Sequence, residues 1–297
     1  MSDPLVLTLI AAEDGRADLP AVVASCAERL ALGAPPLWLA PELACDLPVA
    51  GAVPSAEAEA IGRRAIGTAA IDIVVQPQAG RRKRLLVADM ESTMIENEML
   101  DELADFLGLR APVSEITRRA MNGEIDFAAA LRERVALLQG MPAAMLDTAA
   151  SRIRIMPGAS ALVATMRRHG ALTALVSGGF AVFAERVAAQ LGFERVIANT
   201  LDLADGAIAG TVRPPIVTGE TKHRTLLDLA TSHGVPVAAT MAVGDGANDL
   251  PMLQAAGLGV AFRAKPAVAA AARCRIDHAD LTALLFAQGY REEEIVG

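Results

Sequence analysis

Apolar residues in the first part of the chain form short runs that fit a small domain of mixed structure. The runs Leu5–Ala11 and Ile71–Gln76 each predict a strand. Apolar positions at helical spacing in Leu19–Leu32 and Ala56–Gly67 predict two helices. Several prolines between these helices favour short extended pieces. Residues 1–80 are therefore expected to form an α+β domain.

From Leu85 onward, predicted strands alternate with predicted helices, which indicates an α/β fold with a parallel sheet over residues 81–297. Residues from about 95 to 156 interrupt this alternation with helical spacing, as at Met99 and Leu103. This block is too long for a simple crossover between strands. It is expected to form a helical cap, which excludes water from the edge where the strands end.

The last third of the chain continues the alternation with one exception. Arg195–Leu203 and Ile208–Val212, joined by Asp205-Gly206, predict a β-hairpin. Leu250–Ala256 then predicts a short helix, and Gly259–Phe262 predicts another strand.

The predicted strand that begins at Leu85 ends abruptly in polar residues, at Asp89, Glu91, Ser92 and Thr93. Ligands bind at the carboxyl ends of the strands in open parallel sheets. An aspartate in that position can attack a phosphorus atom and carry the phosphoryl group as an acyl phosphate. Asp89 is therefore a candidate nucleophile, whereas taken alone it could equally cap the next helix.

Two later segments supply groups that bind phosphate. Ser177 and Gly178 follow the apolar run Leu172–Val176, and they offer a hydroxyl and a backbone amide near the start of a predicted helix. Lys222 lies near the start of the predicted helix Lys222–Ser232 and offers a positive charge.

A third strand end supplies acids. Asp245 and Asp249 follow the apolar run that starts at Met241, and Asn248 lies between them. Together with Asp89 they offer the hard oxygen ligands that Mg²⁺ prefers. A nucleophilic acid, phosphate-binding groups, a cation and metal-binding acids are the parts that a phosphoryl-transfer site needs.

Length and charge narrow the function further. The 297 residues suffice for two domains, and the formal net charge of −8 argues against a general nucleic-acid binder. No apolar segment reaches the roughly 18 residues of a membrane span. The start Met1–Pro4 lacks the basic region of a secretory signal, so no membrane or export role is expected.

Two smaller features have simple interpretations. The basic cluster Arg81–Arg84 is interpreted as a solvated linker, with a contact to an anion as the alternative. Cys26, Cys45 and Cys274 form no CxxC pair, so neither a zinc site nor a disulfide framework is expected. A reduced, cytoplasmic setting fits this pattern.

The motifs resemble the haloacid dehalogenase superfamily of phosphotransferases, and within it the branch that hydrolyses phosphoserine. The similarity covers roughly Leu85 to Leu285 and includes the cap. The resemblance implies a Rossmannoid parallel sheet with a helical cap inserted after the first strand. The matching segments are Asp89–Ile95, Asp101–Ala104, Arg118–Gly123, Leu131–Leu138, Val176–Phe180 and Val243–Asp249.

The resemblance also implies a role for each matching residue. Asp89 would be the nucleophile, and Glu98 and Arg134 in the cap would bind the amino group and the carboxylate of the substrate. Met121 and Phe127 would line the same cap pocket. The implied phosphate-binding set is Ser177, Gly178, Lys222 and Asn248. The implied magnesium set is Asp89, the backbone carbonyl of Glu91, Asp245 and, in a supporting role or through water, Asp249.

Glu91 departs from the family pattern, which has aspartate two residues after the nucleophile. That acid protonates the leaving oxygen and then activates water. Glutamate keeps the carboxyl group but adds one methylene, a reach of ~1.5 Å. We expect a local shift of backbone or rotamer that lets Glu91 do the same work, whereas a slower enzyme or one that favours transfer remains an alternative.

The expected function is magnesium-dependent hydrolysis of O-phospho-L-serine to L-serine and phosphate, the last step of serine biosynthesis. One alternative is a phosphatase or phosphotransferase for another small amino-acid phosphate, such as phosphohomoserine. Another alternative, of a different class, is a non-catalytic ligand sensor. Residues 1–80 resemble a degenerate ACT-like regulatory domain, and the oligomeric state is open, with a homodimer as one option.

Overall fold

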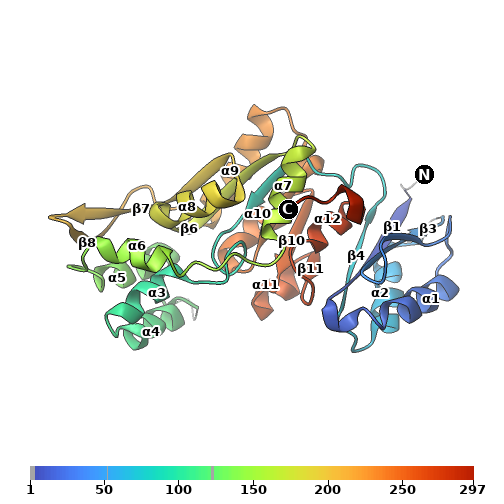
Figure 1. The fold of residues 1–297 in the computed structure, drawn as a ribbon, viewed down its shortest axis with the longest axis horizontal. Coiled ribbons are helices and arrows are strands. Elements are labelled where there is room, and N and C mark those ends of the chain that lie inside the picture. Colours follow the sequence, from blue (N-terminus) through green and yellow to red (C-terminus); the bar gives the residue numbers. More distant parts are fainter. Residues whose placement is uncertain (1–3, 52, 122–123) are drawn as a thin grey trace.

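The computed structural model describes residues 4–51, 53–121 and 124–297, except for the side chain of Met121. The described chain folds around two β-sheets, one of four strands and one of seven. The two sheets lie side by side along the longest axis of the molecule (Figure 1). Among the described residues, no helix combines the length and the apolar character needed to cross a membrane.

The smaller sheet is antiparallel and has the strand order β2-β3-β1-β4. Two helices cover one of its faces, and their apolar sides and the sheet enclose a separate core around Leu7, Leu47 and Cys26. The strands are β1 (Leu5–Ala11), β2 (Leu37–Ala40), β3 (Ala44–Val49) and β4 (Ile71–Pro77), and the helices are α1 (Leu19–Arg29) and α2 (Ser55–Ile66).

The larger sheet is parallel except for its last strand, and its order is β11-β10-β9-β5-β6-β7-β8. Strand β5 is completely buried, because each of its residues is apolar and faces a covered side of the sheet. The strands are β5 (Leu85–Ala88), β6 (Leu172–Phe180), β7 (Arg195–Ala204), β8 (Ala207–Arg213), β9 (Thr240–Gly244), β10 (Leu258–Phe262) and β11 (Cys274–Ile276).

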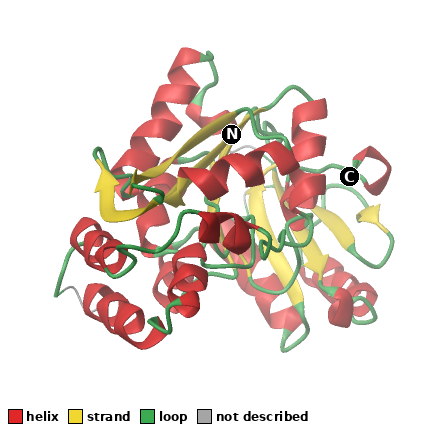
Figure 2. Cartoon of the chain, turned by 60° about the vertical axis from the view of Figure 1, so that its left-hand side comes forward, coloured by secondary structure: helices red, strands yellow, loops and turns green. Residues whose placement is uncertain are grey.

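Helices pack on both faces of the larger sheet, as Figure 2 shows. The apolar residues of the two faces belong to two different buried clusters, one on each side of β5. The helices are α7 (Ala159–Arg168), α8 (Ala181–Leu191), α9 (Gly219–Ser232), α10 (Leu250–Ala255), α11 (Pro266–Ala271) and α12 (Ala283–Ala287), with short 3₁₀ turns at Glu13–Gly15, Val237–Ala239, Ala247–Asp249 and Glu292–Glu294. The expected α/β fold with a parallel sheet is thus confirmed.

The block between β5 and β6 is helical, as its spacing predicted. Its helices lie at the opposite end of the molecule from the smaller sheet (Figure 1). Asp126 caps the third of them by accepting a hydrogen bond from the Ala129 amide at 2.7 Å. The helices of this cap are α3 (Met99–Phe106), α4 (Arg110–Met121), α5 (Phe127–Ala136) and α6 (Ala144–Ala150).

The β7–β8 hairpin extends from the larger sheet and supports the cap. The amide of Gly140 donates to the carbonyl of Ile208 at 2.9 Å, and the amide of Ile208 donates to Met141 at 2.9 Å. The amide of Ala143 donates to Gly206, in the hairpin turn, at 2.8 Å. Main-chain bonds therefore fasten the cap to a part of the core sheet.

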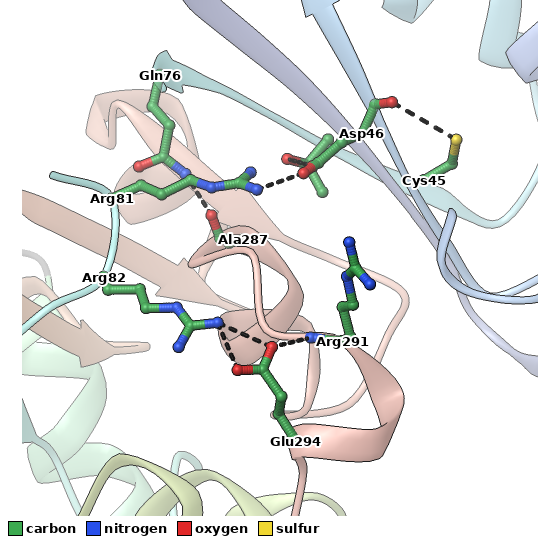
Figure 3. Close-up of polar contacts among 9 residues, drawn as sticks. Cys45, Asp46, Gln76, Arg81, Arg82, Ala287, Arg291 and Glu294 are labelled. Carbon is green, nitrogen blue, oxygen red and sulfur yellow. Dashed lines mark hydrogen bonds and ion pairs between the residues drawn. The ribbon is translucent and has the colours of Figure 1, made fainter. Parts of the chain in front are cut away.

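Polar side chains fasten the smaller sheet to the end of the chain, as Figure 3 shows. Gln76 donates to the carbonyl of Ala287 at 2.6 Å. Arg81 forms an ion pair with the buried carboxylate of Asp46 in β3. These contacts join the linker and the smaller sheet to α12, although the residues are far apart in the sequence.

The interpretation of the basic cluster as a solvated linker was wrong for Arg81 and Lys83, whereas Arg82 and Arg84 are exposed. Arg82 donates twice to Glu294, at 2.7 and 2.8 Å, and its guanidinium also lies over the ring of Tyr290. Lys83 is buried, and its ammonium donates to the carbonyls of Gly80 and Ala238. Arg81, Arg82 and Lys83 therefore join the linker to the smaller sheet and to residues around the larger one.

Asp72 makes the densest of these contacts between the two sheets. Its side chain is buried in β4, and its carboxylate accepts the amides of Asp277 at 2.8 Å, His278 at 3.1 Å and Ala279 at 2.8 Å. A carboxylate that accepts several amides satisfies donors that would otherwise lack partners in a sheltered place. The loop after β11 thus depends on a residue of the smaller sheet.

Asp72→Ala should lower the free energy of unfolding by about 3 kcal/mol, because it leaves sheltered amides without their acceptor. Urea unfolding would measure this change. Asp228→Ala, at an exposed position on α9, is the control and should change the value by less than about 0.5 kcal/mol. Equal effects of the two substitutions would contradict the role given to Asp72.

Candidate active site

The ends of three neighbouring strands bring the candidate residues together. Strand β5 lies between β6 and β9, and all three run in parallel. Asp89 follows β5, and its amide donates to the carbonyl of Val243 in β9 at 3.0 Å. Asp245 follows β9, and Ser177 lies in β6. The sheet order therefore places the nucleophile candidate between the acids and the phosphate-binding turn.

Three buried acids and one buried lysine form the centre of the site. Carboxylate oxygens of Asp89, Asp245 and Asp249 lie within 4.8 Å of one another. The Lys222 ammonium is fully buried, donates to Asp249 at 2.6 Å and forms an ion pair with Asp89. Lys222 lies one turn inside α9, because Thr218 caps that helix earlier than the sequence predicted.

The charges at this centre are not balanced. Burial raises the pKa of Asp89 to about 8, although Lys222 opposes that shift, and burial raises the pKa of Asp245 to about 6. Burial lowers the pKa of Lys222, but the charges of Asp249 and Asp89 outweigh it and raise that pKa overall. Three buried acids and one buried lysine leave an excess of negative charge at the centre. A metal ion, which prefers oxygen ligands, would fit there.

The turn at Ser177, Gly178 and Gly179 leaves the regular strand pairing. The register of β6 against β7 shifts between Val176 and Phe180, so the turn bulges out of the ladder. The Gly179 amide donates to the Ser177 hydroxyl oxygen at 2.9 Å, which leaves the hydroxyl hydrogen free to donate elsewhere. The turn can therefore present a hydroxyl donor and an amide to an anion.

Neither glycine of this turn has room for a side chain. A Cβ at Gly178 would lie 2.9 Å from the ring of Phe127 and 3.7 Å from the amide of Asn248. A Cβ at Gly179 would lie 2.9 Å from the Glu91 carboxylate. Phe127 of the cap and Asn248 of the core thus both reach the candidate phosphate site.

Glu91 folds back so that its carboxylate lies against the cap. It accepts the amide of Met99, the first residue of α3, at 2.9 Å. Burial and the nearby charge of Glu98 raise the pKa of Glu91 to about 8. The additional methylene is accommodated between Gly179 and the start of a helix, whose free amides favour a carboxylate.

The two cap residues expected to bind substrate lie on different elements around Glu91. Glu98 is exposed just before α3 and accepts the Ser92 hydroxyl at 2.8 Å. Arg134 is half-buried on α5, and its charge acts on Glu91. No hydrogen bond or ion pair joins Glu98 to Arg134 in the described part of the chain. The side chain of Met121 lies outside the described residues.

Two polar residues near the site were not identified from the sequence. Lys265 precedes α11, and its ammonium lies 3.5 Å from the Asp245 carboxylate. Asn199 is buried in β7 and donates to the carbonyl of Gly178 at 2.7 Å. Neither belongs to a recognisable motif, although Lys265 directly precedes the proline that opens α11.

Comparison with known proteins identifies the family. The family model for haloacid dehalogenase-like hydrolases matches residues 86–254, which include the strand ends and the cap. The chain belongs to this family of hydrolases. The match begins within β5, so the smaller sheet lies outside it.

Individual relatives are also similar to this chain. The phosphoserine phosphatase SerB2 of Mycobacterium tuberculosis is 43% identical over 227 residues, which cover 76% of this chain and 56% of the relative. A HAD family hydrolase of Salmonella enterica serovar Typhi has a similar structure, with a TM-score of 0.85 at 28% identity over 96% of this chain and 98% of that chain.

A third similarity concerns a reaction intermediate. A solved phospho-aspartyl intermediate analogue of phosphoserine phosphatase has a TM-score of 0.65 at 36% identity, and the match covers 69% of this chain and 98% of that chain. The chain spans only 52 to 60% of the length of the first three curated relatives that it matches.

Lys222→Met should lower the free energy of unfolding by about 4 kcal/mol when a chelator removes divalent cations, because it leaves two buried carboxylates without a counter-charge. Lys265→Met is the matched control, because Lys265 also pairs with an acid of the site but is 56% exposed. It should cost less than about 1 kcal/mol. Urea unfolding that gave similar losses for both would contradict the central role of Lys222.

Proposed function

We propose that the chain is a magnesium-dependent phosphatase that hydrolyses O-phospho-L-serine to L-serine and phosphate, the last step of serine biosynthesis. The observation that carries this proposal is the position of Asp89. It pairs with the buried ammonium of Lys222, and it follows the strand next to the one that carries the glycine turn. Its charge also acts on a second acid, Glu91, which contacts the cap. The named relatives support the same substrate.

In the first step, an oxygen of Asp89 attacks phosphorus and the bond between phosphorus and the seryl oxygen breaks. Glu91 gives its proton to that oxygen, so serine leaves as a neutral alcohol. Ser177, Gly178 and Lys222 hold the phosphate oxygens through a hydroxyl, an amide and an ammonium. The product on the protein is an aspartyl phosphate at Asp89.

In the second step, a water molecule attacks the phosphorus atom of the aspartyl phosphate. Glu91, now a carboxylate, takes a proton from that water, and the bond between Asp89 and phosphorus breaks. Phosphate leaves, and Glu91 is again protonated. Hydrolysis therefore needs one acid that can serve both steps, and the contact of Glu91 with α3 holds it between the core and the cap.

Mg²⁺ is the proposed metal ion. Asp89, Asp245 and the backbone carbonyl of Glu91 would hold it, and Asp249 would support it directly or through water. When bound, the ion supplies positive charge that reduces the repulsion between the carboxylate and the phosphate dianion. Asn248, whose amide lies near Gly178, would also bind the phosphate.

Glu98 and Arg134 are proposed to select the amino acid. The two opposite charges lie on separate cap elements and do not pair, so they can bind the ammonium and the carboxylate of one small zwitterion. An arginine fork suits a carboxylate because it can donate two parallel hydrogen bonds. Phosphohomoserine, which is one methylene longer, remains the second candidate substrate.

Residues 1–80 are proposed to form a domain separate from residues 81–297, with the cap at about 95–156. The separate core of the smaller sheet supports this division. A regulatory role of that domain, a homodimer and a cytoplasmic location stay predictions from the sequence.

The central test measures phosphate release from L-phosphoserine, with and without Mg²⁺, beside O-phosphothreonine and phosphohomoserine. We expect release that needs Mg²⁺ and prefers phosphoserine by about tenfold or more, since a misplaced methyl or methylene costs roughly 1–3 kcal/mol in a fitted pocket. Faster phosphate release from phosphohomoserine would show that phosphohomoserine is the preferred substrate. Transfer of the phosphoryl group to an added alcohol would show that the protein is a phosphotransferase.

Absence of turnover would favour the sensor alternative. Glu91→Asp then separates two cases, because it restores the acid that the family usually has. Turnover recovered by Glu91→Asp would show that the additional methylene alone prevents the reaction. Magnesium-dependent phosphate binding without turnover in both proteins would contradict the assignment as an enzyme.

Arg134→Ala should raise the KM for phosphoserine about tenfold to a hundredfold, because a hydrogen bond between charged groups contributes roughly 1.5–3 kcal/mol. Arg132→Ala, at an exposed position on the same helix, is the matched control and should leave KM within about twofold. Steady-state kinetics would measure both. An unchanged KM in Arg134→Ala would refute the proposed carboxylate contact.

A further inference from the structure

The buried side chain of Asn199 connects two elements of the candidate phosphate site. It lies in β7 and is 1% exposed. Its amide nitrogen donates to the carbonyl of Gly178 at 2.7 Å, and its amide oxygen accepts the backbone amide of Val217 at 2.8 Å. A carbonyl needs a donor and an amide needs an acceptor, so the two partners fix the orientation of the Asn199 side chain.

The hydrogen bond from Asn199 to Gly178 holds the phosphate-binding turn at a point where strand pairing is interrupted. The bulge between Val176 and Phe180 removes the Gly178 carbonyl from the regular ladder. The Asn199 side chain replaces the missing ladder bond. The same peptide unit is held at its other end, because the Gly179 amide donates to the Ser177 hydroxyl. These two hydrogen bonds restrain rotation of the peptide plane.

The second bond holds the segment that leads to Lys222. Val217 directly precedes Thr218, the residue that caps α9. Lys222 lies in the first turns of that helix, and its amide donates to the carbonyl of Thr218 at 3.0 Å. A shift of the backbone at Val217 would therefore move the base of the helix that carries the buried ammonium.

We propose that Asn199 is a positioning residue that sets the separation between the Ser177–Gly179 turn and the start of α9. It does not touch the phosphate itself. It fixes the distance between the Ser177–Gly179 turn and Lys222. Both are proposed to bind the oxygens of the same phosphate. The inference rests on the proposed phosphate site, and it adds a residue that no motif marks.

The structure offers a matched control in Gln288. This side chain is also completely buried and also bridges two backbone groups. Its amide nitrogen donates to Leu284 at 2.9 Å, and its oxygen accepts the amide of Lys83 at 2.9 Å. It lies in the segment that follows α12, away from the site. Loss of Gln288 reproduces the structural cost of losing a buried bridging amide without touching the phosphate-binding elements.

The experiment compares Asn199→Ala, Asn199→Asp and Gln288→Ala in the full chain with Mg²⁺. It measures Tm, binding of inorganic phosphate by calorimetry, and kcat and KM for para-nitrophenyl phosphate. Both alanine variants should lower Tm to a similar extent. Asn199→Ala should also lower kcat about a hundredfold, the effect of a misplacement of roughly 1 Å, and weaken phosphate binding, whereas Gln288→Ala should leave both within about twofold.

Asn199→Asp separates the two bonds. Aspartate can still accept the Val217 amide, but an ionised carboxylate cannot donate to Gly178 and would face its carbonyl. It should therefore lower kcat nearly as much as alanine does, and it provides a second variant if Asn199→Ala does not fold. The proposal is overturned if both Asn199 variants keep phosphate affinity and kcat within about threefold of the wild type, or if Gln288→Ala loses as much.

Failure of this proposal can be told apart from failure of the proposed function. Inorganic phosphate and para-nitrophenyl phosphate test the phosphate site without the serine part. A wild type that binds phosphate but does not act on phosphoserine would overturn only the substrate assignment. A wild type that binds no phosphate would overturn both.

Discussion

The buried ammonium of Lys222, between Asp89 and Asp249, is the interaction on which the site depends. It keeps carboxylates close together in a buried place, where each negative charge raises the pKa of the neighbouring acids. The sheet order requires this crowding, because β5 and β9 end side by side and each ends in an acid. The site thus combines a fixed positive charge, the Lys222 ammonium of α9, with three acids whose arrangement fits a metal ion.

Glu91 shows where the longer side chain of a glutamate fits in this site. Its longer side chain ends at the amide of Met99, so the carboxylate is held by the first helix of the cap. It also lies so close to Gly179 that a side chain there would displace the carboxylate. The position of this acid therefore depends on the core turn and on the cap together.

Much of this arrangement followed from the sequence because strand ends carry a local signature. The apolar runs before Asp89, Ser177 and Asp245 predicted their strands, and parallel strands end at one edge. The ion pair of Arg81 was missed because nothing near Arg81 in the sequence reveals Asp46, which folding brings opposite. Asn199 was missed for a similar reason, since its partners belong to other elements. The role of a single polar residue of this kind depends on partners that are distant in the sequence and become neighbours only in the folded chain.

The bonds between the β7–β8 hairpin and the cap limit how the cap can move. Gly140 and Ile208 join the cap to the far end of the hairpin, and Asn199 lies near the root of the same hairpin. The hairpin therefore contacts the cap at one end and, through Asn199, the Ser177–Gly179 turn at the other. A movement of the cap that carried the hairpin with it would therefore also act on the turn that is proposed to bind phosphate.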